Sequence, residues 1–128
     1  DDIGGGNIIG KVAYIDKNDS YILSDHVYKL SKKVKNIDTL FFSYLINSYP
    51  INKELRKKSS GSAQLGLGKN LVEKQQIQFP LYDEQNHIAT ILSDMDNEIN
   101  ALEKKLSKTK ELKQGLMQEL LTAKIRLV

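Results

Sequence analysis

The chain has 128 residues, a formal net charge of +3 and no cysteine, which excludes a disulfide framework and a thiolate metal site. It contains no secretory signal pattern and no apolar run long enough to span a membrane, so we expect a cytoplasmic protein with no membrane partner. Residues 1–82 carry twelve Lys or Arg against eight Asp or Glu, whereas residues 83–128 carry seven against eight. The basic excess therefore lies in the N-terminal part.

Short strands are predicted in two regions of the chain. Residues 11–15 and 21–23 are apolar runs separated by the turn-like residues 16–20, and residues 26–30 alternate between two faces. Residues 72–79 predict a further strand. With the helices below, this pattern predicts an α+β fold, in which a small mixed globular domain precedes a long C-terminal coiled-coil helix.

Two short helices are predicted in the middle of the chain. Asp38 is a good N-cap for the first, which Pro50 would close. A basic helix is predicted at residues 52–58, followed by a serine- and glycine-rich loop that continues to Asn70. The apolar stripe of the first helix consists of Leu40, Phe41, Tyr44 and Leu45.

The last third of the chain predicts one long helix. Apolar residues recur at intervals of three and four from Ile88 to Leu127 without a proline, and Asp83 is suited to cap the helix. About 40 residues would span roughly 60 Å, so we expect the helix to project beyond its own domain. Only Thr109 and Lys113 interrupt the seam, which requires a partner helix to cover it. The expected helix interface consists of Ile88, Leu92, Met95, Ile99, Leu102, Leu106, Leu116 and Leu120.

Enzyme motifs in the chain are incomplete. Gly5, Gly10 and Lys11 have the spacing of a phosphate-binding loop, but Val12 replaces the Ser or Thr that binds magnesium. The run Ser-Asp-His at residues 24–26 cannot form a nucleophile relay, because neighbours in a strand point to opposite faces. We therefore expect no catalytic residue, no metal and no cofactor on this chain.

Binding to nucleic acid is the interpretation that the central residues favour. Lysine and arginine can neutralise phosphates, while Ser, Gln and Asn can hydrogen-bond to phosphates or base edges. A solvated helix end followed by a plain linker has the same composition, so both interpretations stay open at this point. The candidate DNA-binding residues are Lys11, Lys53, Arg56, Lys57, Lys58, Ser59, Ser60, Ser62, Gln64, Lys69 and Asn70.

Several segments carry a resemblance to a known family. They are residues 10–14, 61–71, a junction from Gln78 through Pro80 to Glu84 and Gln85, and residues 114–121 (QGLMQELL) at the end of the helix. In this combination the chain resembles the DNA-specificity subunit of type I restriction–modification systems. The resemblance covers the second part of a target-recognition domain and one conserved spacer helix.

The resemblance implies a division of labour. Residues 1–82 would form a DNA target-recognition domain that is incomplete at its N-terminus, and residues 83–128 a spacer and dimerisation helix. The chain would be a non-catalytic subunit that reads half of a bipartite site in double-stranded DNA. It would direct the methylation and restriction subunits, which carry S-adenosylmethionine, ATP and Mg²⁺.

One departure from the family leads to a further expectation. A full family member has two recognition domains and two spacer helices, whereas this chain has one of each. We therefore expect either a half-subunit that works as a homodimer or with a second specificity half, or a fragment of a longer protein. The alternative from another functional class is a coiled-coil adaptor whose globular part binds protein instead of DNA.

Overall fold

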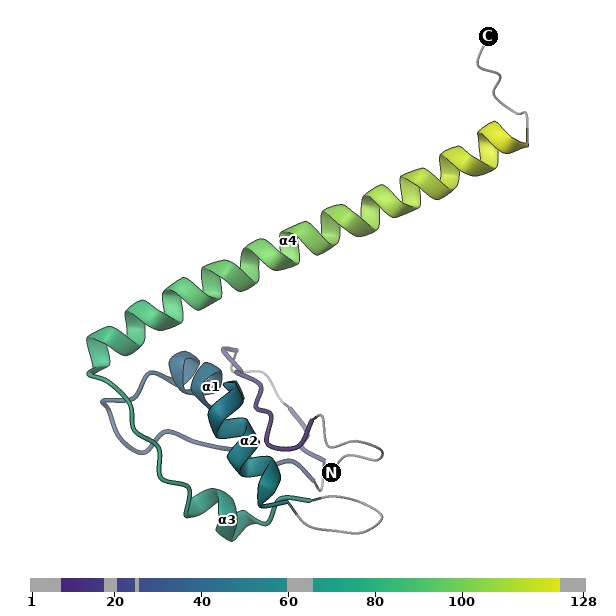
Figure 1. Cartoon of the computed structure of the whole chain (residues 1–128). Helices are drawn as coiled ribbons and strands as arrows, with labels where there is room; N and C mark the ends of the chain where they lie inside the picture. The colour runs from purple at the N-terminus through teal and green to yellow at the C-terminus, as the bar shows by residue number, and fades with distance from the viewer. Residues whose placement is uncertain (1–7, 18–20, 25, 60–65, 123–128) are drawn as a thin grey trace. The chain divides into compact units, whose positions relative to one another are not determined.

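The computed structural model describes residues 8–17, 21–24, 26–59 and 66–122. These residues contain the helices α1 (Thr39–Asn47), α2 (Tyr49–Lys57), α3 (Lys69–Glu73) and α4 (Tyr82–Leu121), as Figure 1 shows. The chain divides into two compact units, Asp1–Ala89 and Thr90–Val128, so α4 begins in the first unit and continues into the second. None of the helices in the described part of the chain is long and apolar enough to cross a membrane.

Helices α1 and α2 follow each other with one residue between them. The Asp38 carboxylate accepts a hydrogen bond of 2.6 Å from the backbone N–H of Phe41, which confirms Asp38 as the N-cap of α1. The predicted basic helix is present as α2. The prediction that Pro50 closes the first helix is wrong, because Pro50 lies in the first turn of α2. A proline is tolerated there, since the N–H that it lacks has no partner within the helix.

A small core holds the first unit together. Its buried apolar side chains include Phe41 and Ile46 of α1, Leu55 of α2, Ala89 of α4 and Ile9 from the N-terminal segment. These residues come from segments up to 80 positions apart, so the core joins the start of α4 to the two short helices and to the segment before them.

The β part of the predicted α+β class is not confirmed. Residues 11–15, 21–23 and 26–30 form no regular strand among the described residues. The backbone N–H and C=O of Val12 bind the side-chain amide of Asn47, at 3.0 and 2.9 Å, instead of a neighbouring strand. The apolar side chains of these segments are also largely exposed, so their alternation does not mark a buried face.

Helix α3 (Lys69–Glu73) lies where a loop and the start of a strand were predicted, and residues 74–79 form no strand. The backbone N–H of Leu71 donates to the carbonyl of Gly68, and the N–H of Lys74 donates to the carbonyl of Asn70. Local hydrogen bonds thus satisfy the amides that a strand would have offered to a neighbour. The predicted boundary between loop and strand at this point is wrong.

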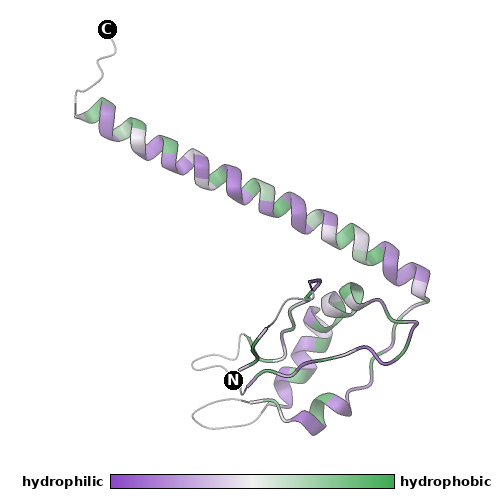
Figure 2. Ribbon diagram, turned by 180° about the vertical axis from the view of Figure 1, so that it is seen from behind, coloured by the Kyte–Doolittle hydropathy of each residue, from purple (hydrophilic) through white to green (hydrophobic). Residues whose placement is uncertain are grey.

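Helix α4 confirms the predicted long C-terminal helix. Its 40 residues correspond to about 60 Å, and Figure 2 shows apolar residues recurring between hydrophilic ones along it. The prediction that Asp83 is the N-cap is wrong, because the helix begins at Tyr82 and Asp83 lies within its first turn. Its negative charge still lies near the positive end of the helix dipole. The predicted continuation to Leu127 falls outside the described residues.

Candidate nucleic-acid interface

Helix α2 and its C-cap residue carry a group of exposed basic side chains, which we call the basic cluster: Lys53, Arg56, Lys57 and, at the C-cap, Lys58. The opposite face of the helix is buried through Asn52 and Leu55, so packing against the core holds the cluster toward solvent. The Lys53 Nζ atom lies 5.1 Å from the centre of the Tyr49 ring, within the range of a cation–π contact. Arg56 and Lys57 lie in the last turn, near the negative end of the helix dipole.

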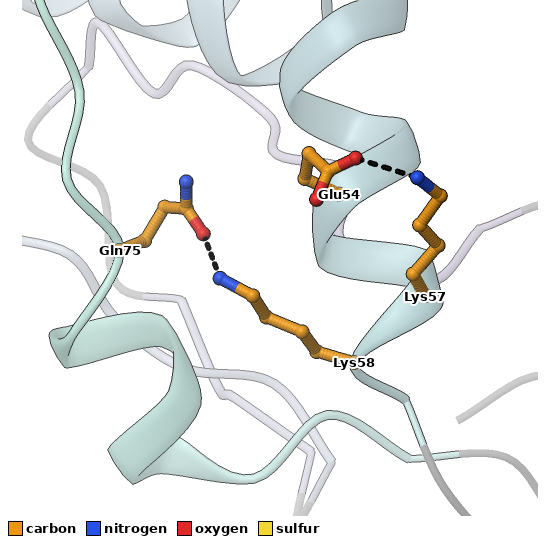
Figure 3. A network of polar contacts seen from close by, with 4 residues as sticks. All are labelled: Glu54, Lys57, Lys58 and Gln75. Atoms are coloured by element: carbon orange, nitrogen blue, oxygen red, sulfur yellow. Dashed lines mark hydrogen bonds and ion pairs between the residues drawn. The ribbon is translucent and has the colours of Figure 1, made fainter.

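The lysines of the basic cluster have exposed polar partners. Lys57 Nζ lies 2.8 Å from Glu54 Oε1, and Lys58 Nζ donates a hydrogen bond of 2.5 Å to Gln75 Oε1, as Figure 3 shows. The hydrogen bond from Lys57 lowers the pKa of the Glu54 carboxyl, and the same contact raises the pKa of Lys57. Exposed pairs of this kind add little stability. A phosphate oxygen can therefore replace these partners at small cost.

The structure brings α3 into the same neighbourhood. The Lys58–Gln75 hydrogen bond joins the end of α2 to the residues just after α3. Lys69 is exposed at the start of α3, where its Nζ lies 3.7 Å from Glu73 Oε1, and Asn70 is exposed beside it. The Ser59 hydroxyl donates a hydrogen bond to the carbonyl of Arg56 at the end of α2. The remaining candidates Ser60, Ser62 and Gln64 lie outside the described residues.

Lys11 is exposed on a turn that two asparagines fasten to the helices. The Asn52 side chain donates to the carbonyl of Ile9 at 3.2 Å, and Asn47 binds both backbone groups of Val12. Neither asparagine was predicted from the sequence to have a role at the site. The signal that could have identified them is a polar side chain on the buried or half-buried face of a helix.

Gln85 is the most deeply buried side chain among the described residues, at 1% exposure. Its Oε1 atom accepts a hydrogen bond of 2.9 Å from the N–H of Asp38, and its Nε2 atom donates to the carbonyls of Asn36 and Pro80, at 3.2 and 2.8 Å. One side chain thus joins the first turn of α4 to the segment that caps α1. The junction from Pro80 to Gln85, which carries the family resemblance, has a structural role here.

The seam of α4 is accessible over most of its length. The six seam residues from Met95 onward are between 38% and 58% exposed. Ile88 and Leu92, at the start of the seam, are half-buried. A shallow apolar surface near the end of the helix is formed by Leu112, Leu116, Met117, Leu120 and Leu121 with the stems of Thr109 and Lys113.

Comparison with known proteins identifies the class of this chain. Residues 3–114 match the family described as "Type I restriction modification DNA specificity domain", and the chain belongs to that family. It is 34% identical over 102 residues to the type I restriction enzyme MjaVIII specificity subunit of Methanocaldococcus jannaschii, covering 79% of this chain and 23% of that protein. It is 30% identical over 118 residues to the putative type I restriction enzyme MjaX specificity subunit of the same organism, covering 89% of this chain and 27% of that protein.

These matches confirm the resemblance seen in the sequence. Both relatives are named as specificity subunits of type I restriction enzymes. The chain spans about a quarter of the length of these relatives. No solved structure matches the chain.

Proposed function

We propose that this chain binds double-stranded DNA and reads one half of a bipartite site for a type I restriction–modification complex. In that complex it directs the methylation and restriction subunits to their DNA. The observation that carries the proposal is the exposed basic cluster on α2 in a member of a DNA-specificity family. The residues proposed to contact DNA are the basic cluster with Lys11, Ser59, Ser60, Ser62, Gln64, Lys69 and Asn70.

The physical basis is the neutralisation of phosphates by cations held on one rigid element. Each lysine that displaces a counterion makes the logarithm of the binding constant fall by about 0.9 per logarithmic unit of salt. The partners of Lys57 and Lys58 within the chain are single exposed groups, which a phosphate can replace. The cluster therefore supplies affinity and orientation, while polar side chains of the loop read the bases.

A salt titration tests this proposal. Fluorescence anisotropy with a 30-bp duplex would follow binding of the unaltered chain and of the double variant Lys57→Ala/Lys58→Ala between about 50 and 200 mM salt. We expect the salt slope of the variant to be shallower by about 1.8, from two lost contacts. The matched control is Lys104→Ala/Lys108→Ala, which removes the same charge from exposed positions of α4.

The adaptor alternative predicts a different result. A protein-binding globule would give no anisotropy change with DNA even at about 50 mM salt, where phosphate contacts are strongest. A slope that changes equally in both double variants would likewise contradict a DNA site at α2.

The long helix is proposed to pair with a second copy of itself through its seam. The exposed apolar residues of the seam need a partner surface that shields them from water. The acidic and basic residues of α4 are also segregated along the helix. Residues 82–103 carry six acidic and no basic side chains, whereas residues 104–121 carry five lysines and two glutamates. Two helices in opposite directions would place each acidic half beside a basic half, and parallel helices would place like charges together.

The seam also has the symmetry that an antiparallel pair needs. A two-fold axis at Lys104 would pair Ile88 with Leu120, Leu92 with Leu116 and Leu102 with Leu106. The same axis would set Met95 opposite Lys113 and Ile99 opposite Thr109, which puts both polar interruptions against apolar residues. Such a dimer would present two recognition surfaces to an inverted-repeat DNA site.

A further inference from the structure

Lys11 lies on a turn whose backbone is held on both sides. Before it, the carbonyl of Ile9 accepts a hydrogen bond from Asn52 Nδ2 at 3.2 Å. After it, the N–H of Val12 donates to Asn47 Oδ1 at 3.0 Å, and the carbonyl of Val12 accepts from Asn47 Nδ2 at 2.9 Å. The N–H of Lys11 itself donates to the carbonyl of Ile8 at 3.1 Å. The turn is therefore fixed to α1 and α2, while the Lys11 side chain is exposed.

Gly10 shows how closely this turn approaches α2. Its φ angle is +70°, in the left-handed region that favours glycine. A Cβ atom at this position would lie 3.1 Å from Leu55 Cβ and 3.2 Å from Asn52 Nδ2. The turn is thereby held against the face of α2 that carries Asn52 and Leu55.

We infer that Asn47 and Asn52 are positioning residues that fix the backbone of Lys11, so that its exposed side chain serves as a phosphate contact. This inference rests on the proposed DNA-binding function. Asn52 is 6% exposed, and its side-chain amide donates a hydrogen bond to the carbonyl of Ile9. It therefore acts through Lys11 and does not touch DNA itself. Both polar atoms of the Asn47 side chain form hydrogen bonds with the backbone of Val12. Fixing the backbone of a lysine lowers the ordering cost that its contact with a phosphate must overcome.

A double-mutant cycle tests the positioning role on the 128-residue chain with a 30-bp duplex of random sequence. We expect Lys11→Ala to make the salt slope shallower by about 0.9, equivalent to roughly threefold across the range from 50 to 200 mM. Asn47→Ala should have nearly the same effect in the unaltered chain and no further effect in the Lys11→Ala background. Asn47→Asp keeps the acceptor for the Val12 N–H but loses the donor to its carbonyl, so we expect an intermediate slope. The control Asn100→Ala, at an exposed position of α4, should change nothing.

A second measurement uses the unaltered chain and does not depend on any variant. Acetylation of lysines in the presence and absence of DNA should show protection of Lys11 comparable with that of Lys57, and none of Lys104. Additive effects in the cycle, an Asn47→Ala chain with normal slope, or equal acetylation of Lys11 in both samples would overturn the inference. Unfolding of both Asn47 variants, seen by circular dichroism, would also overturn it in favour of a purely structural role.

The outcomes separate this inference from the function on which it rests. If the unaltered chain fails to bind DNA at about 50 mM salt, the proposed function itself is wrong. If it binds with a slope that depends on Lys57 and Lys58 but not on Lys11, only the positioning role is wrong.

Discussion

Gln85 gives the sharpest test of how the first unit is assembled. Its three hydrogen bonds connect the first turn of α4 to the backbone of Asp38, Asn36 and Pro80. A typical intramolecular hydrogen bond contributes about 1 kcal/mol net, so Gln85→Ala should destabilise the junction by about 3 kcal/mol. The matched control is Gln78→Ala, which removes an exposed glutamine from the same unit.

Hydrogen exchange measured by mass spectrometry can localise this loss. Because Asp38 caps α1 and is itself held by Gln85, the amides of α1 should exchange roughly 150-fold faster in Gln85→Ala, while those of residues 109–121 stay unchanged. Exchange of α1 that differs from the unaltered chain by less than about threefold would refute the reasoning. So would an equal effect of Gln78→Ala.

Gln85→Glu separates the donor contacts from the acceptor contact. The introduced carboxyl keeps the acceptor for the Asp38 N–H but faces the carbonyl oxygens of Asn36 and Pro80 in a buried position. Burial and these oxygens raise its folded-state pKa above the unfolded value of about 4.3. The native state then binds more protons than the unfolded state, so stability falls as pH rises above about 4. Urea unfolding at pH 4 and pH 8 should show this variant closest to the unaltered chain at the lower pH, and the opposite order would contradict it.

Three other predictions follow from named contacts. Glu54→Gln removes the carboxylate that competes with phosphate for Lys57, so DNA affinity at about 50 mM salt should rise two- to fivefold. Anisotropy measures this change, and an unchanged affinity would argue against a phosphate contact at Lys57. In the proposed antiparallel dimer, Asp96 and Lys110 flank the seam on the same side. Asp96→Lys should therefore weaken association by about 1–2 kcal/mol and Asp96→Lys/Lys110→Glu should restore it, as measured by sedimentation; failure of the double variant to recover would exclude this register. Asp38→Ala removes the N-cap of α1 and should cost about 1 kcal/mol in urea unfolding, with Asp94→Ala on the exposed face of α4 as the neutral control.

Helices α1, α2 and α4 were predictable because their signals are local, whereas α3 was not. Asp38 is followed by an apolar stripe, and the seam from Ile88 repeats over many turns, so capping and periodicity suffice. The predicted strands are not formed at the described residues 11–15, 21–23 and 26–30, because alternation of residues says nothing about whether a neighbouring strand is present. At Val12 the place of that neighbour is taken by the side chain of Asn47, 35 residues away.

The candidate interface was predictable in part. Composition alone identified the basic cluster, because four cations within six residues cannot all be buried. The residues that organise it were missed. Gln75, Asn47, Asn52 and Gln85 act through hydrogen bonds to residues 17 to 49 positions away, and nothing in their own sequence surroundings reveals such partners.

Selection of bound sequences from random duplex DNA tests the central claim most directly. The purified chain, with and without the methylation subunit of its system, would be incubated with the pool at about 50–100 mM salt, and bound DNA would be amplified and sequenced. We predict enrichment of one short motif, repeated in inverted orientation across a gap of constant length. Recovery of DNA without any shared motif in both samples would contradict a role in sequence recognition.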